Sequence, residues 1–175
     1  MMRYIVYPAL GVLLASSSAC FVHRGGSDAE RGGATLEVDS AQYTLKRKGE
    51  FYTTTIGYHY TNHTGALVSA NHCFAPPPPM LEKQSADGRW VGAGGSVQLT
   101  CLMLPPFRIP DGGSYAGTYS VLAARRDANI FPKLDIDSVT GNYRLRWALR
   151  AGADPDDNRA PEVVAISNVF RLIGP

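Results

Sequence analysis

The sequence predicts an all-β fold, an antiparallel β-sandwich of about seven strands, with a small β-barrel as the alternative. Three observations support this prediction. Short segments rich in β-branched and aromatic residues alternate between apolar and polar positions. Clusters of glycine and proline separate these segments. No segment shows a sustained helical period with capping residues.

The clearest strand candidate is residues 51–62, FYTTTIGYHYTN, which are dense in β-branched and aromatic side chains. Successive side chains of a strand point to opposite faces of the sheet. The side chains expected to share one face are therefore Tyr52, Thr54, Ile56, Tyr58 and Tyr60.

Residues 143–150, YRLRWALR, alternate strictly between apolar and cationic positions. The side chains expected to face the core are Tyr143, Leu145, Trp147 and Leu149. The side chains expected on the solvent face are Arg144, Arg146 and Arg150. Such arginines suit anionic lipid headgroups or polysaccharide, and an ordinary solvated face is the simpler interpretation.

Five further segments have strand character and are separated by turn signals such as NHTG, APPPPM, PPFRIPDGG and AGADPDDNRAP. They are residues 66–73, 88–93, 96–104, 117–125 and 162–172. Residues 76–79, PPPP, are expected to form a stiff extended connector, because proline has no amide to donate to a central strand.

The first nineteen residues have the layout of a secretory signal peptide. Arg3 is the only charge before residue 24, and residues 4–15 are almost wholly apolar. That run is about 12 residues long, against the roughly 20 that a helix needs to span a bilayer. The alternative, a buried core helix, lacks both an amphipathic period and a cap.

The end of this segment, Ser17-Ser18-Ala19-Cys20, resembles the lipobox of bacterial lipoproteins. The resemblance implies cleavage before Cys20 and a diacylglycerol on its sulfur. The family prefers Leu three positions before the cysteine, where this chain has Ser17. The alternative is ordinary cleavage nearby, which leaves Cys20 paired or free. A lipid would anchor the exported chain to a membrane of the cell envelope.

Cys73 and Cys101 remain as a possible disulfide once Cys20 carries lipid. An oxidising compartment permits the bridge. It would close a loop of about 29 residues and stabilise the fold by roughly 3–4 kcal/mol in the chain-entropy model. Two buried free thiols are the alternative, and the spacing matches no zinc pattern.

Length and composition indicate one folded domain behind a tether. Residues 20–34 comprise the lipidated cysteine and a polar, glycine-rich linker, and residues 35–175 are expected to form a single β-sandwich domain. The formal net charge of +2 is nearly neutral and gives no argument for a nucleic-acid partner.

The segment TGNYRLRW, residues 140–147, resembles the start of the penultimate strand of immunoglobulin-like domains, where Gly-x-Tyr precedes a core strand. Gly141 and Tyr143 match this pattern, whereas Val139 and Leu145 replace the family's aspartate and cysteine. The resemblance implies an immunoglobulin-like sandwich without the usual inter-sheet disulfide. It also implies that Tyr143 forms a tyrosine corner with upstream backbone.

Residues 51–150 also loosely resemble small bacterial immunoglobulin-like domains of the BsuPI proteinase-inhibitor type. The shared features are TNHTG after a first strand, DGRWV in the middle, a proline- and glycine-rich stretch, and then GNYRLRW. This resemblance implies the sandwich and does not extend to the inhibitory activity.

His59, His63 and His72 fall within fourteen residues and are the candidate metal ligands. A hairpin between residues 51–62 and 66–73 would bring His59 toward His72 and place His63 in the turn. No carboxylate lies nearby in sequence to orient the rings. Solvated strand and turn histidines are the simpler interpretation, and no metal or cofactor is expected.

Other chemistry-bearing patterns are incomplete. Asp154, Asp156 and Asn158 match the first, third and fifth positions of a calcium loop, but Arg159 and Ala165 stand where the loop requires Gly and Glu. Ser96 and Ser114 lie in glycine-rich turns without a nucleophile elbow. Asp135 and Asp137 share one face of an extended segment, and an exposed edge explains them as well as acid–base work.

The sequence therefore favours a non-enzymatic structural or interaction module of the cell envelope, anchored through lipid and contacting an envelope protein or glycan. A metal- or ligand-binding lipoprotein using the three histidines is one alternative. An inhibitor of an extracellular protease, inserting a loop such as APPPPM or PPFRIP, is another.

Overall fold

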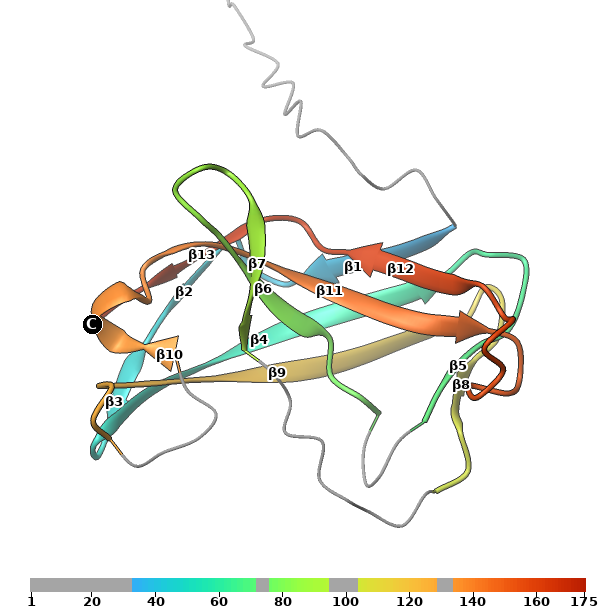
Figure 1. Ribbon diagram of the computed structural model, residues 1–175, viewed down its shortest axis with the longest axis horizontal. Coiled ribbons are helices and arrows are strands. Elements are labelled where there is room, and N and C mark those ends of the chain that lie inside the picture. The colour runs from blue at the N-terminus through green and yellow to red at the C-terminus, as the bar shows by residue number, and fades with distance from the viewer. Residues whose placement is uncertain (1–32, 72–75, 95–103, 129–133) are drawn as a thin grey trace, which may run out of the picture.

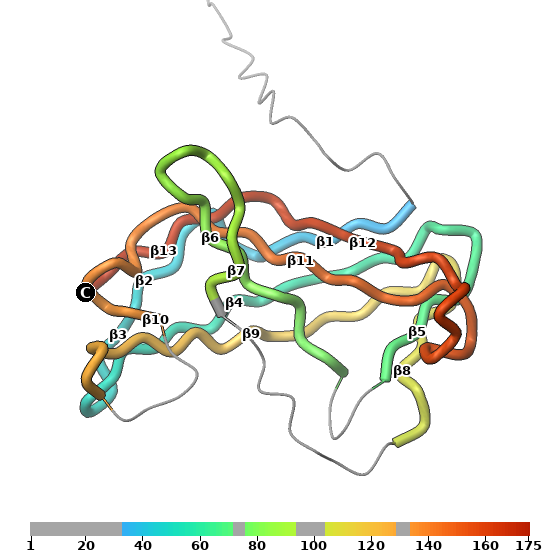
Figure 2. The backbone as a smooth tube through the Cα atoms, viewed as in Figure 1, coloured from blue at the N-terminus to red at the C-terminus, as the bar shows by residue number. Residues whose placement is uncertain are grey.

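The computed structural model describes residues 33–71, 76–94, 104–128 and 134–175, and these form a two-sheet β-sandwich (Figures 1 and 2). The first sheet contains β1 (Ala34–Val38), β3 (Lys46–Lys48), β4 (Phe51–Asn62), β9 (Ser114–Ala124) and β10 (Leu134–Asp135). The second contains β2 (Gln42–Thr44), β5 (Val68–Ala70), β6 (Met80–Gln84), β7 (Trp90–Gly94), β8 (Phe107–Ile109), β11 (Gly141–Ala151), β12 (Glu162–Ile166) and β13 (Phe170–Ile173). A single 3₁₀ turn, η1 (Ile136–Ser138), is the one helical element of the described residues.

The sheet order confirms the sandwich over the barrel, because the described strands form two separate hydrogen-bonded sheets. In the first sheet β4 lies between β1 and β9, and in the second β11 lies between β13 and the pair β5 and β6. This is the A-B-E and C-F-G order of immunoglobulin sandwiches. Most ladders are antiparallel, while β2–β13 and β9–β10 are parallel.

Thirteen strands are described, where the sequence predicted about seven, because several long strands are interrupted. Residues 167–169 separate β12 from β13, although both pair with β11. Residues 39–41 carry the chain from β1 in the first sheet to β2 in the second. Each interruption divides one immunoglobulin-type strand into two short ones.

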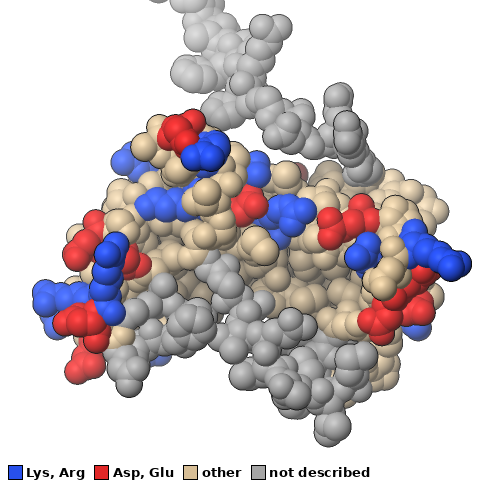
Figure 3. Space-filling model, in the orientation of Figure 1, with Lys and Arg blue, Asp and Glu red and all other residues tan. Residues whose placement is uncertain are grey.

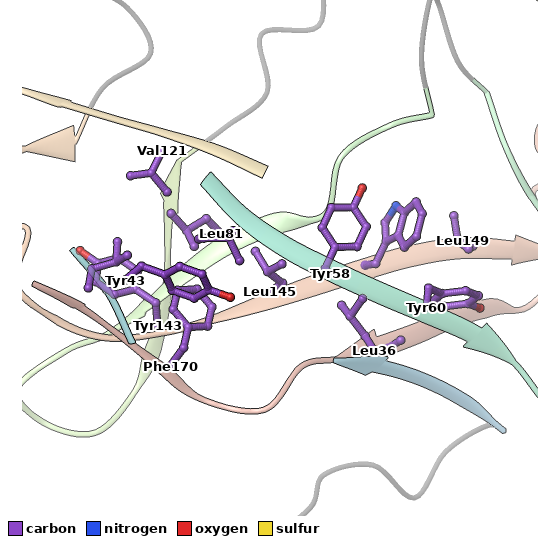
Figure 4. Packing of buried hydrophobic residues seen from close by; sticks show 14 of the residues in the cluster. Leu36, Tyr43, Tyr58, Tyr60, Leu81, Val121, Tyr143, Leu145, Leu149 and Phe170 are labelled. Carbon is purple, nitrogen blue, oxygen red and sulfur yellow. The ribbon is translucent and has the colours of Figure 1, made fainter. Parts of the chain in front are cut away.

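The strands β4 and β11 confirm the alternation that the sequence predicted. On β4, Ile56, Tyr58 and Tyr60 are no more than 6% exposed. On β11 the four predicted core residues are no more than 2% exposed. Burial of each large apolar side chain stabilises the fold by about 1.5–3 kcal/mol. Figure 4 shows Tyr58 and Tyr60 of β4 between the sheets with Tyr143, Leu145 and Leu149 of β11.

Several strands are too short or too charged to be predicted from an alternating sequence pattern. The segments MLEKQ (β6) and KRK (β3) carry charges, and β8 lies inside a proline- and glycine-rich run that was assigned as a turn. Burial on one face accounts for β6 and β8, whereas the wholly exposed β3 is defined by its pairing with β4, and neither kind of information is local to the segment. The predicted strand at 96–104 lies outside the described residues except for Leu104, which is not in a strand.

The tyrosine corner expected at Tyr143 is present. The Tyr143 hydroxyl, on a side chain only 1% exposed, donates a 2.6 Å hydrogen bond to the carbonyl of Val139. This bond fixes the entry of the chain into β11. The equally buried Tyr60 hydroxyl has no hydrogen-bond partner among the described residues, and burial raises the pKa of both tyrosines to about 12.

These two hydroxyls predict opposite outcomes for the same substitution. Tyr143→Phe leaves the Val139 carbonyl without a partner and is expected to lower the free energy of unfolding by about 1–3 kcal/mol. Tyr60→Phe removes a hydroxyl that is buried without a partner, so stability should stay unchanged or rise. Urea denaturation followed by tryptophan fluorescence measures both, and equal losses in the two variants would contradict the assignment.

Candidate functional site

One long edge of the first sheet is left open in the described structure. Strand β9 has eleven residues, and ten residues of β4 pair with it on one side. On its other side only Ala123 and Ala124 are paired, in the short parallel ladder with β10. The nine residues from Ser114 to Leu122 therefore have no strand beside them among the described residues.

The chemistry of this edge is unusual for a strand that lacks a neighbour. Its nine residues, SYAGTYSVL, contain no charge and no proline. Edge strands are normally protected from pairing by charges, especially lysine, or by proline. Strand β3 shows that protection in the same sheet, because its three residues, Lys46–Lys48, are all cationic and exposed.

A hollow of about 320 Å³ lies beside the open edge. Eight residues from β1, β4, β9 and the turn after β1 line it: Glu37, Val38, Asp39, Gly57, Tyr58, His59, Ala116 and Gly117. Glu37 is opposite His59 in the β1–β4 ladder, and Ala116 is opposite His59 in the β4–β9 ladder. The side chains of Glu37, His59 and Ala116 are exposed, on the outer face of the first sheet.

Gly57 and Asp39 give the hollow its shape. The Asp39 amide donates a 3.1 Å hydrogen bond to the Gly57 carbonyl. A Cβ atom at Gly57 would lie 2.2 Å from Asp39 Oδ2, so only glycine leaves room for this carboxylate. The Tyr43 hydroxyl donates to Asp39 Oδ1, and burial together with this bond raises the Tyr43 pKa far above its usual value. The Tyr43 hydroxyl therefore stays protonated and holds the Asp39 carboxylate over the sheet by its hydrogen bond.

Two carboxylates and one imidazole are among the side chains that line the hollow. Glu37 and Asp39 supply two carboxylates, and the His59 ring lies with Nδ1 3.4 Å from Thr61 Oγ1. No cationic side chain is among the lining residues. The hollow can therefore accept a cation, and its small residues Gly57 and Ala116 leave space for one.

The predicted histidine cluster is not assembled as expected. Strand β4, with His59, belongs to the first sheet, while β5 belongs to the second, so the predicted hairpin between them does not form. His63 is exposed in the turn after β4, and His72 lies outside the described residues. Within the described ranges no group of three His, Cys, Asp or Glu side chains could hold a metal ion.

The three cysteines lie outside the described residues, so the lipidation of Cys20 and the Cys73–Cys101 disulfide stay predictions. Residues 1–19 and most of the tether 20–34 lie outside them as well. In the described ranges, no helix has the length and apolar character needed to cross a bilayer.

The remaining candidates form local turns. Asp154 and Asp156 lie in the β11–β12 loop, where Asp154 Oδ1 accepts from the Asp156 amide and Asp156 Oδ1 accepts from the Asn71 side chain.

Asp135 caps η1 by accepting from the Asp137 amide, so the two do not share a face of an extended segment. Ser114 begins β9, Asn158 lies in the β11–β12 loop, and Ser96 is outside the described residues.

The arginines of β11 are not the free cationic row that the sequence suggested. Arg144 Nε lies 2.7 Å from Glu82 Oε2, and both side chains are at most 15% exposed. The Arg144 guanidinium also lies over the Trp90 ring, 4.4 Å from its centroid. Arg144 thereby ties the β6–β7 hairpin to β11. Figure 3 shows cationic and anionic side chains intermixed over the visible face.

The other two predicted surface arginines are also engaged. Arg146 lies 3.6 Å from Glu162, with side chains 32% and 48% exposed. Arg150 donates a hydrogen bond to the Ala160 carbonyl. These contacts join β11 to β12 and to the loop before it, which is a structural role.

Comparisons with known proteins identify no family. No family model matches the chain, and no curated protein matches it. Among solved structures, target SoR45 of the Northeast Structural Genomics Consortium is 14% identical, covering 82% of this chain and 88% of that one, with a TM-score of 0.46. The AlkC alkylpurine DNA glycosylase of Pseudomonas fluorescens is 11% identical, covering 82% of this chain and 31% of that one, with a TM-score of 0.34. A PapD-like domain of human CEP192 is 11% identical, covering 97% of this chain and 99% of that one, with a TM-score of 0.27.

Replacing the arginines of the two ion pairs of β11 is expected to lower the free energy of unfolding by different amounts. Arg144→Leu leaves the Glu82 carboxylate largely buried without its partner and should lower the free energy of unfolding by about 3 kcal/mol. Arg146→Leu, on the same face of the same strand, should cost less than about 1 kcal/mol, because its pair is solvated. Urea denaturation of both variants tests this difference. Losses of the same size would show that Arg144 is not a clamp.

Gly57 and Asp39 are expected to be energetically coupled. Gly57→Ala forces the Asp39 carboxylate away from Tyr43 and should destabilise the fold by about 1–3 kcal/mol. In the Asp39→Ala background the same change should cost much less, because the clash is gone. A double-mutant cycle measured by thermal or urea unfolding gives the coupling. Additive effects would mean that Asp39 does not sit over Gly57.

Proposed function

We propose that this chain is an exported, lipid-anchored, non-enzymatic interaction module of the cell envelope, which binds a partner polypeptide through the open edge of β9. The anchor is Cys20, and the sandwich binds at the end of the tether. The wider partner class expected from the sequence was an envelope protein or glycan, and the strand edge favours the protein.

The N-terminal pattern supports the anchor. A cationic start, a short apolar run and small residues before Cys20 match an export signal of the lipoprotein type. The first strand of the described residues begins at Ala34, and the tether of residues 20–34 stays part of the proposal. The polar, glycine-rich composition of residues 21–34 supports a linker between the lipid and the folded domain.

The open edge of β9 is the observation that carries the binding role. Addition of a strand to an exposed sheet edge is a common mode of peptide recognition, in which main-chain hydrogen bonds supply affinity. The nine uncharged residues from Ser114 to Leu122 offer such an edge, and a partner strand is the simplest way to satisfy its backbone groups.

The alternatives receive less support. The metal-binding hypothesis depended on a hairpin that does not form. The inhibitor hypothesis named two candidate loops: in PPFRIP, Phe107–Ile109 form strand β8, paired with β5, while residues 76–79 of APPPPM lie in no strand, and that loop remains a candidate. Neither is the function that the arrangement of the described residues favours.

The anchor is tested by the intact mass of the native protein from the membrane fraction, with and without reductant and thiol alkylation. We expect a chain that begins at Cys20 and carries acyl chains, with Cys73 and Cys101 alkylated only after reduction. The Cys20→Ala variant should leave the membrane fraction, because the lipid is the expected anchor. A soluble wild-type product without lipid would overturn the anchored role.

The binding role is tested in the same cells by photo-cross-linking. A photo-reactive residue in place of Thr118, on the open edge, should give a cross-linked species of higher mass. The matched control is the same residue in place of Arg171, which is exposed on β13 of the other sheet. Equal yields at both positions, or none at Thr118, would contradict binding through β9 and leave the anchor unaffected.

A further inference from the structure

We infer that the edge of β9 binds an extended basic polypeptide strand, with a Lys or Arg side chain of that strand seated in the adjacent acidic hollow. This inference rests on the proposed function, because it names the partner class of the same edge. Three features of the structure carry it: the direction of the backbone groups of β9, the position of the hollow, and its charge.

The backbone groups of alternate β9 residues point away from β4. The Gly57 carbonyl accepts from the Asp39 amide on the β1 side, so Gly57 does not exchange hydrogen bonds with its β9 partner, Thr118. Asn62, five residues further along β4 and so of the opposite parity, directs its amide and its carbonyl toward Gly113 and Gly112 on the β9 side. In an antiparallel pair these two kinds of position alternate. The N–H and C=O groups directed toward the open side, clear of the β10 ladder, are therefore those of Ser114, Ala116, Thr118 and Ser120.

The hollow lies where a side chain of an added strand can reach it. Ala116 and Gly117 of β9 form the wall nearest the open edge, and Gly57 of β4 lies one strand further in. Neighbouring strands are about 4.8 Å apart. A long side chain on the added strand, next to Ala116, crosses Ala116 toward Gly57, its diagonal neighbour on β4, and the Asp39 carboxylate that lies over Gly57, while His59, opposite Ala116, flanks this path. Lys and Arg suit this path, because their apolar stems lie along such residues while the charged head reaches polar groups.

The charge of the hollow selects a cation. Glu37 and Asp39 are the carboxylates that line it, and Tyr43 holds Asp39 in place. The open edge from Ser114 to Leu122 contains no Lys or Arg. A second copy of this chain paired edge to edge would bring no cation from that segment to the hollow. A foreign basic strand satisfies both the backbone edge and the carboxylates, which favours it over self-association.

The test uses two synthetic peptides as long as the open edge, built of alternating Thr and Val and identical except for a central Lys or Gln on the Thr face. Binding to the full chain as purified from cells is measured by fluorescence anisotropy at low and physiological salt. We expect the Lys peptide to bind roughly threefold to tenfold more tightly than the Gln peptide, and the difference to shrink with salt.

Two variants separate the edge from the hollow. Thr118→Pro removes an N–H that faces away from β4, a position where proline is tolerated in an edge strand, and should abolish binding of both peptides. Thr118→Val keeps that N–H and is the matched control, with unchanged binding. The double variant Glu37→Gln, Asp39→Asn should bind both peptides equally, because only the charge preference is lost.

Each contrary result has a definite meaning. Equal binding of the Lys and Gln peptides to the wild-type chain would overturn the acidic hollow as a cation site. Binding that survives Thr118→Pro in a folded protein would show that the peptide does not add to β9. No peptide binding, with a dimer in sedimentation that Thr118→Pro dissociates, would assign the edge to a second copy. None of these three results bears on the lipid anchor, which is tested by intact mass. Binding of a partner at the β9 edge in cells is tested by cross-linking at Thr118.

Discussion

The antiparallel ladder between β4 and β9 is the constraint on which the rest of the molecule depends. Its ten consecutive pairs fix which face of each strand meets the core. Because β4 pairs with β1 and β3 on one side and with β9 on the other, it is the central strand of the first sheet, and β9 is the longest strand that reaches an edge of that sheet among the described residues. The register of this ladder places Ile56, Tyr58 and Tyr60 inside and His59 outside. The same register places Ala116 opposite His59 and Gly57 opposite Thr118, and the hollow forms where these positions meet the carboxylates of Glu37 on β1 and Asp39 in the turn after it.

Polar groups in and around the core decide how the second sheet is held. Asn62, fully buried at the end of β4, donates to the carbonyls of Ala66 and Ile109 and accepts from Thr64, so it ties the turn after β4 to β8. Tyr143 fixes the start of β11, and Arg144 fixes the β6–β7 hairpin against it. Most of the charge on β11 is thereby used within the fold. Among the described residues, the backbone groups and charges available to a partner lie on the outer face of the first sheet and along the unpaired edge of β9.

Much of the fold could be predicted from the sequence, and the candidate site could not. The alternation in residues 51–62 and 143–150 identified the two central strands, and the Gly-x-Tyr pattern identified the corner at Tyr143. The pairing of strands is not local, so the expected hairpin that would join His59 to His72 was wrong. Arg144 was assigned to solvent because its partners, Glu82 and Trp90, lie about sixty residues away along the chain. An open edge has no sequence signal except the absence of charge in SYAGTYSVL, which is equally typical of a central strand.

The central claim is that β9 has an unpaired edge in the free protein, and amide hydrogen exchange resolved by residue tests it most directly. If the edge is open, exchange should alternate along the strand: slow at Tyr115, Gly117 and Tyr119, whose amides face β4, and fast at Ala116, Thr118 and Ser120. Uniformly slow exchange from Ser114 to Leu122 in the monomer would show that this edge is already covered. The proposed mode of partner binding would then be wrong.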